Sequence, residues 1–205
     1  MKIKICGITT EEEVKWLNQA NVDYAGFVLF FEKSKRNVSL ERAKELLKVL
    51  NGSITPVAVT VEPEIEQIRQ IEKAGFSILQ IHGKIPECVV KEIGIPVWKA
   101  FNVSDLSEFA YYDQCDRIGG FVLDAQMPGS GTTFDWTLLE GIPKTEKQVM
   151  LAGGLNPDNI GIALRELQGK IQGVDTSSGV EKENGVGKDK QKIELFVKKV
   201  RQNCL

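Results

Sequence analysis

Eight short β-rich segments alternate with helix-like segments along the chain, and this alternation limits the possible folds more than any other feature. Repeated strand–helix units favour a parallel sheet with helices packed outside it. Eight units predict an α/β protein with a closed (β/α)8 TIM barrel, formed as a single domain by residues 1–205. The main alternative is an open doubly wound sheet, which usually needs fewer strands. The expected strands are Lys2–Cys6, Ala25–Phe30, Thr55–Val61, Ser77–Ile81, Pro96–Phe101, Gly119–Asp124, Gln148–Ala152 and Ile171–Asp175.

The helix-like segments carry recognisable end signals. Thr10, Ser39 and Asn156 have side chains that can accept backbone N–H bonds at a helix start, and Gly75 is typical of a helix stop. The polar stretch 181–190, EKENGVGKDK, is the most flexible-looking segment, and we expect it to join the last strand to the last helix. The expected helices are Thr10–Gln19, Leu40–Leu50, Glu64–Lys73, Pro86–Glu92, Asp105–Tyr112, Trp136–Leu139, Asn156–Leu167 and Lys188–Gln202.

Composition narrows the classes of function. The net charge is −2 at pH 7, which argues against a nucleic acid or an anionic membrane as partner. No apolar run has the length of a membrane span and no signal peptide is recognised, so we expect a cytoplasmic protein with reduced thiols. No two of the four cysteines have C-x-x-C spacing, and one histidine cannot form a histidine-rich metal site.

The ends of the expected strands supply the candidates for function, because a barrel builds its active site at the C-terminal ends of its strands. Cys6 ends the first strand, His82 follows the fourth and Asp124 ends the sixth. The last two strands lead into LAGGL and DTSSG. Glycine-rich loops at these two positions often bind phosphate in barrels. The candidates there are Gly153, Gly154, Asp175, Ser177, Ser178 and Gly179.

Each candidate also has an ordinary structural explanation. A buried cysteine such as Cys6 is usually a small, inert hydrophobic residue. Asp124 is either a buried hydrogen-bond centre or an acid with a raised pKa, and His82 is either a satisfied core residue or catalytic. Arg36, in EKSKRNVS, is either a solvated loop charge or an anion-binding group. Glycine-rich turns alone are what any parallel barrel needs.

Taken together, several motifs resemble the phosphoribosylanthranilate isomerase family of tryptophan biosynthesis: KICGIT, GFVLFFEKSKRNVS, LQIHG, VLDA followed by GSGTTFDW, LAGGLNPDNI and VDTSSGVE. The similarity runs from Lys2 to about Lys190. It implies a (β/α)8 fold and the Amadori rearrangement of N-(5-phosphoribosyl)anthranilate to 1-(2-carboxyphenylamino)-1-deoxyribulose 5-phosphate. It further implies no metal and no organic cofactor. Thr60 stands where the family pattern leads us to expect an aromatic residue, so substrate packing is expected to differ there.

The resemblance also implies roles for individual residues. Cys6 matches the family's general base, Asp124 its general acid and Arg36 the group that holds the anthranilate carboxylate. A thiolate base would need a lowered pKa, which the helix after CGIT and nearby cations could provide, whereas the acid would need a raised one. His82 and Asp175 match substrate-binding positions without an assigned step, and Gly153, Gly154, Ser177, Ser178 and Gly179 match the phosphate site.

Two other functions remain as alternatives at this point. An isomerase of histidine biosynthesis runs the same rearrangement on another phosphoribosyl amine, but related barrels of that kind use two aspartates, whereas here the first strand ends in Cys6. A phosphosugar-binding regulatory protein would keep the pocket without catalysis. The expected partner is the small phosphosugar–anthranilate substrate, and the chain is expected to be a monomer or a homodimer.

Overall fold

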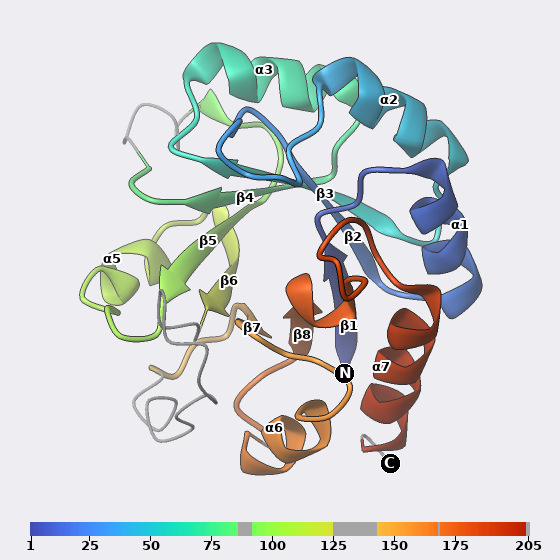
Figure 1. Ribbon diagram of the computed structural model, residues 1–205. Coiled ribbons are helices and arrows are strands. Elements are labelled where there is room, and N and C mark those ends of the chain that lie inside the picture. Colours follow the sequence, from blue (N-terminus) through green and yellow to red (C-terminus); the bar gives the residue numbers. More distant parts are fainter. Residues whose placement is uncertain (86–91, 125–142, 168, 204–205) are drawn as a thin grey trace.

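The strands form a closed parallel barrel, as the alternation predicts. The computed structural model describes residues 1–85, 92–124, 143–167 and 169–203, and in these ranges each strand pairs in parallel with the next while the eighth closes onto the first (Figure 1). This closure excludes the open doubly wound sheet. The strands are β1 (Lys2–Cys6), β2 (Tyr24–Val28), β3 (Thr55–Val61), β4 (Ile78–His82), β5 (Val97–Asn102), β6 (Ile118–Asp124), β7 (Gln148–Ala152) and β8 (Gly173–Thr176).

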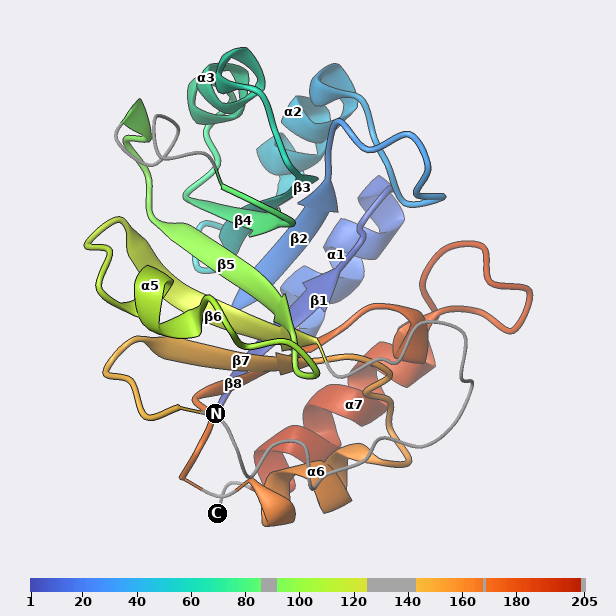
Figure 2. The same cartoon turned by 90° about the vertical axis from the view of Figure 1, so that its left-hand side faces the viewer.

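The helices pack around the outside of this barrel, and the N-terminus and the end of the last helix lie at one end of it (Figures 1 and 2). Within the described ranges, none is long and apolar enough to cross a membrane. The expected helix Trp136–Leu139, most of Pro86–Glu92 and the loop GSGTTFDW lie outside the described residues. The helices are α1 (Glu11–Ala20), α2 (Leu40–Val49), α3 (Ile65–Ala74), α5 (Phe109–Asp113), α6 (Ile160–Glu166) and α7 (Lys190–Gln202), with a short 3-10 helix, η2 (Ser178–Val180).

Three of the four helix-end signals named from the sequence are confirmed, whereas the helix expected to begin at Asp105 begins at Phe109. Thr10 forms a capping box with Glu13 at the start of α1, and Ser39 caps α2. Gly75 ends α3 in the left-handed conformation, with φ 94°, which glycine adopts without steric cost. Asn156 differs, since its side-chain oxygen accepts the N–H bonds of a preceding turn and α6 begins only after Asn159.

The last helix starts later than the sequence predicts. Asp189 caps this helix, so Lys188 lies outside it. The Lys188 side chain is buried, with only 1% exposed. The stretch 181–190 is therefore not simply a solvated connection, because it carries a buried acid, Glu181, and a buried base. These two charges lie beside the barrel mouth.

Two apolar layers hold the barrel together. One layer, which includes Ile3 and Ile5, packs between the strands and the helices. The other fills the inside of the barrel with residues such as Val57, Val122 and Met150. Because side chains alternate along a strand, Lys4 and Cys6 must face the inside of the barrel, opposite to Ile3 and Ile5. The side chains of Lys4 and Cys6 therefore point towards the site.

Candidate active site

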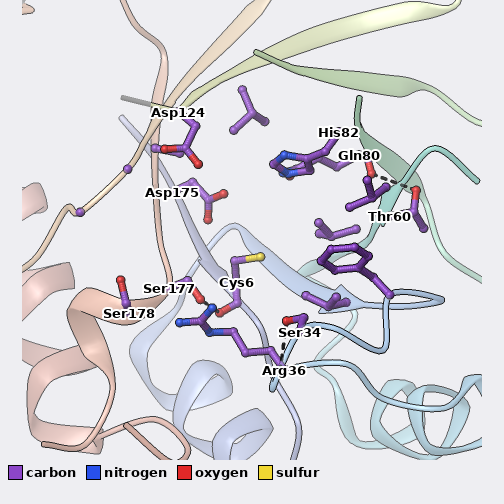
Figure 3. Close-up of a pocket in the computed structure, with 18 residues that line it drawn as sticks. Cys6, Ser34, Arg36, Thr60, Gln80, His82, Asp124, Asp175, Ser177 and Ser178 are labelled. Carbon is purple, nitrogen blue, oxygen red and sulfur yellow. Dashed lines mark hydrogen bonds between the residues drawn. The ribbon is translucent and has the colours of Figure 1, made fainter. Parts of the chain in front are cut away.

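A cavity of about 390 Å³ opens at the carboxyl ends of the strands and brings most of the predicted site residues together (Figure 3). The Cys6 sulfur points into the space bounded by Asp124, Asp175 and His82, and Arg36 approaches from the other side (Figure 3). The described lining residues are Cys6, Val28, Phe31, Ser34, Arg36, Val59, Thr60, Val61, Gln80, His82, Val122, Asp124, Ala152, Gly153, Gly154, Asp175, Ser177 and Ser178. Gly179 is not among them.

Cys6 places its thiol at the bottom of the cavity, with the residue 9% exposed. A Cβ at Gly26 of the neighbouring strand would collide with the Cys6 sulfur at 2.9 Å and crowd the Lys4 ammonium at 3.1 Å, so this glycine leaves room for the two groups together. Burial raises the pKa of the thiol, and the charges of Lys4 and Lys188 only partly counter this while Asp175 adds to it. The lowered pKa that a thiolate base would need is therefore not what the site provides, because loss of hydration outweighs the nearby cations.

Beneath the thiol lies a buried ion pair between β1 and β8. The Lys4 ammonium donates to Asp175 Oδ2 over 2.7 Å, and Lys4 is fully buried while Asp175 is 6% exposed. Burial raises the pKa of the Asp175 carboxyl, Lys4 lowers it and the charge of Asp124 raises it again. The other carboxylate oxygen, Oδ1, is buried without a hydrogen-bond partner among the described residues. A buried acceptor of this kind is costly unless a ligand satisfies it.

Asp124 reaches the same mouth from β6. Its place at the strand end follows from the register, which pairs it with Asn102 on β5 and Ala152 on β7. In the closed strand order β6 is three positions from β1, so Asp124 and Cys6 stand across the mouth from one another. Side chains placed in this way can exchange protons with opposite faces of one bound molecule.

His82 lies at the end of β4 and carries no charge at neutral pH. Burial lowers its pKa to about 4, and the charges of Lys4 and Lys99 lower it further in the same direction. The Gln80 side-chain nitrogen lies 2.9 Å from His82 Nε2, which makes that ring nitrogen an acceptor in this arrangement. The Gln80 oxygen is buried without a partner among the described residues and also lines the cavity.

Arg36 comes from the loop after β2 and is held by the loop after β8. Its Nε donates to Glu181 Oε1 over 2.5 Å, and its side chain remains 27% exposed. Thr60 is buried, and its hydroxyl donates to the Gln80 carbonyl over 3.4 Å. Phe31 lines the same cavity as Thr60.

The two loops predicted to bind phosphate do meet. Gly153 and Gly154 both have positive φ values, 96° and 64°, and line the cavity with Ser177 and Ser178. The Ser177 hydroxyl already donates to the Cys6 carbonyl over 2.9 Å, so Ser177 has only its backbone N–H to offer an anion. A side chain at Gly179 would collide with the Leu155 carbonyl, so this glycine lets the two loops pack together.

Four buried polar residues in or beside the cavity were not among the sequence candidates: Lys4, Gln80, Glu181 and Lys188. Strand alternation was a usable signal for two of them, since Lys4 and Gln80 stand two residues before Cys6 and His82 and share their face. No local signal marks Glu181 or Lys188, because Arg36, which binds Glu181, and Glu13, which binds the Lys188 N–H, lie far away in the sequence. Within the described ranges, no three His, Cys, Asp or Glu residues are grouped to hold a metal ion.

A thiol and two carboxylates facing a guanidinium and two glycine-rich loops define an acid–base enzyme of the (β/α)8 class with an anionic substrate. The family model described as N-(5'-phosphoribosyl)anthranilate (PRA) isomerase matches residues 3–199. The chain belongs to this family.

Individual relatives agree with the family match. The N-(5'-phosphoribosyl)anthranilate isomerase of Clostridium kluyveri is 38% identical over 206 residues, covering 98% of each chain. A solved isomerase in complex with reduced 1-(o-carboxyphenylamino)-1-deoxyribulose 5-phosphate is 32% identical, with a TM-score of 0.83 and coverage of 98% of this chain and 99% of that one. Monomers generated from the dimeric isomerase of Thermotoga maritima superpose with a TM-score of 0.83 at 33% identity and the same coverage.

Proposed function

We propose that this chain catalyses the Amadori rearrangement of N-(5-phosphoribosyl)anthranilate to 1-(2-carboxyphenylamino)-1-deoxyribulose 5-phosphate in L-tryptophan biosynthesis. It is an isomerase of the aldose–ketose type, as its family membership indicates. The observation that carries the proposal is that Cys6 and Asp124 line one cavity together with Arg36 and the two glycine-rich loops. The bound product analogue of the related solved isomerase supports a substrate of this size and charge.

The proposed reaction uses one acid and one base. Asp124 protonates the ring oxygen of the aminoaldose, and the ring opens to a protonated imine. Cys6, as thiolate, then removes the proton from C2 of the sugar, and the resulting enolamine tautomerises to the ketone. Each proton transfer contributes about 10²–10⁴-fold to the rate. The position of the two side chains across the mouth supports this division of roles.

The raised pKa of Cys6 has two opposing consequences for a base. It reduces the fraction of thiolate at neutral pH, but it makes each thiolate a stronger base. Lys4 and Lys188 are the cations that favour the ionised thiol. Because the thiolate is the active form, turnover is expected to increase with pH towards the raised pKa of Cys6.

Binding of the substrate follows the distribution of charge in the cavity. Arg36 holds the anthranilate carboxylate through its terminal N–H groups, and the backbone around Gly153, Gly154 and Ser178 holds the phosphate. Asp175 Oδ1, which has no hydrogen-bond partner in the described part of the chain, accepts a hydrogen bond from a sugar hydroxyl or from the amine. Neutral His82 packs beside the sugar without competing for the anionic groups.

The chain acts in the cytoplasm on a small molecule and works as a monomer or a homodimer. The dimeric isomerase of Thermotoga maritima supports the second form. A sedimentation-equilibrium measurement on the purified protein distinguishes the two.

A fluorescence assay tests the proposed reaction. Purified protein is mixed with freshly made phosphoribosylanthranilate, and the loss of anthranilate-type fluorescence is followed against the spontaneous decay of the substrate. A rate well above spontaneous decay is expected. Absence of any acceleration, with tight binding of the product analogue, would instead identify a phosphosugar-binding protein without catalysis.

A further inference from the structure

Glu181 is a buried carboxylate that three cations share. It accepts hydrogen bonds from Arg36 Nε over 2.5 Å, from Lys35 Nζ over 2.9 Å and from Lys188 Nζ over 3.3 Å. Its side chain is only 7% exposed, and it is not among the described residues that line the cavity. Arg36 is the one of these three described partners that lines the cavity, so it is the direct route by which Glu181 affects the substrate.

The contact at Nε fixes the plane of the Arg36 guanidinium. Nε is the inner nitrogen of the planar fork, so a bond there leaves the terminal N–H groups for a second anion. The stem of Arg36 lies directly on Gly7, where any Cβ would collide with the Arg36 Cδ, and Gly7 has φ +78°. The side chain is thus held at its stem and at its head before any ligand arrives.

The same carboxylate connects Arg36 to the reacting thiol. Lys188 Nζ donates to Glu181 and also to the Ser177 carbonyl and hydroxyl, over 3.0 Å and 3.1 Å. The Ser177 hydroxyl in turn donates to the carbonyl of Cys6. A continuous chain of hydrogen bonds therefore runs from the arginine at the mouth to the end of β1. It fixes where the arginine stands relative to the thiol.

We propose that Glu181 is a positioning residue that holds Arg36 ready for the carboxylate of the substrate, and so makes the enzyme select substrates that carry this group. The proposal rests on the proposed function, in which Arg36 binds the anthranilate carboxylate. A flexible arginine loses rotamer freedom when it binds an anion, and prior fixation removes part of that loss. Glu181 acts before binding and does not itself touch the substrate.

The experiment compares two ligands on each variant by isothermal titration calorimetry. One is reduced 1-(o-carboxyphenylamino)-1-deoxyribulose 5-phosphate, and the other is the same molecule without the carboxyl group. The dissociation constant of the ligand without the carboxyl group, divided by that of the ligand with it, measures the contribution of the carboxylate alone. A general loss of structure weakens both ligands and leaves the ratio unchanged, whereas a misplaced Arg36 lowers the ratio.

Glu181→Ala is expected to lower this ratio by about 3- to 10-fold, the equivalent of one side chain that must be ordered on binding. Glu181→Gln keeps an oxygen acceptor for Arg36 Nε and should restore most of the ratio. Lys35→Met is the matched control, because it removes another partner of Glu181 whose side chain is 55% exposed and does not line the cavity. Its ratio should equal that of the parent protein.

Arg36→Met separates the failure of this proposal from that of the proposed function. If Arg36→Met leaves the ratio unchanged, Arg36 does not bind the carboxylate and both statements are overturned. If Arg36→Met abolishes the preference but Glu181→Ala does not change it, only the positioning role is overturned. Glu181→Ala added to Arg36→Met should lower the ratio no further. If Glu181→Ala does not fold, the double variant Glu181→Ala/Lys188→Met replaces it, because this variant also removes the buried lysine that pairs with Glu181. It is compared with Lys188→Met, and the same decrease in the ratio of dissociation constants is expected.

Discussion

Replacing Lys4 by methionine should destabilise the protein strongly, although the Lys4 side chain makes no contact with solvent. Lys4 is fully buried, and its ammonium pairs with Asp175 over 2.7 Å. In Lys4→Met the Asp175 carboxyl keeps its burial but loses the cation that favours its charge. Removing one partner of a buried ion pair typically costs about 3–5 kcal/mol. Natural domains have a free energy of unfolding of about 5–15 kcal/mol, so the variant should fold with much reduced stability.

Urea unfolding measures this cost. With an m-value of about 2–3 kcal/mol per molar urea, a loss of about 3–5 kcal/mol moves the midpoint down by about 1–2.5 M. The double variant Lys4→Met/Asp175→Asn removes both charges and should regain a large part of the loss. A coupling of this sign is expected only if the two side chains interact directly. A midpoint for Lys4→Met within about 0.2 M of the parent would refute the importance of the pair.

Two further predictions concern single residues. His82 is the only histidine, so one imidazole resonance in an NMR titration reports its pKa, expected at about 4; a value near 6.5 would contradict its burial. Because the unfolded chain takes up this proton at higher pH than the native state, stability should decrease as the pH falls from 6.5 towards 4. Gly179→Ala should lower stability by about 1–3 kcal/mol through its collision with Leu155, whereas Gly52→Ala, with open space around it, should change stability little; equal melting temperatures would remove the packing argument.

The barrel could be predicted because its signals are local and repeated. Each strand is a short run that alternates between two apolar surroundings, and each helix has a periodic apolar face with a cap such as Thr10. Eight repetitions of one unit leave few other folds. The expected strand bounds differ from the observed ones by two residues at most, since the ends of a strand depend on pairing with neighbours.

Only site residues at the ends of strands or in the loops after them could be predicted from the sequence. Cys6, His82 and Asp124 were found because strand ends converge in a barrel. Lys4 was missed although it shares the face of Cys6, because a lysine in a strand suggests an exposed position. The raised pKa of Cys6 could not be predicted, because burial depends on the whole barrel, and a sequence shows the nearby cations but not the loss of water.

The loop after β8 shows most clearly what could not be predicted from the sequence. Its sequence is polar and rich in glycine, which is typical of an exposed connection. Glu181 and Lys188 are nevertheless buried, because each meets partners from other elements: Glu181 meets Arg36, and the Lys188 N–H donates to Glu13 Oε1 over 2.7 Å. Such long-range pairs leave no periodic pattern along the chain.

The single-turnover rate with freshly made phosphoribosylanthranilate tests the central claim most directly, when it is measured on the parent protein, Cys6→Ser and Asp124→Asn at equal amounts of folded protein. An alcohol is a far poorer base than a thiolate, and an amide has no acidic proton to donate. Both variants should bind the stable product analogue and melt near the parent temperature, yet turn over at least about 10²-fold more slowly. Near-normal turnover per folded molecule in either variant would contradict the acid–base assignment.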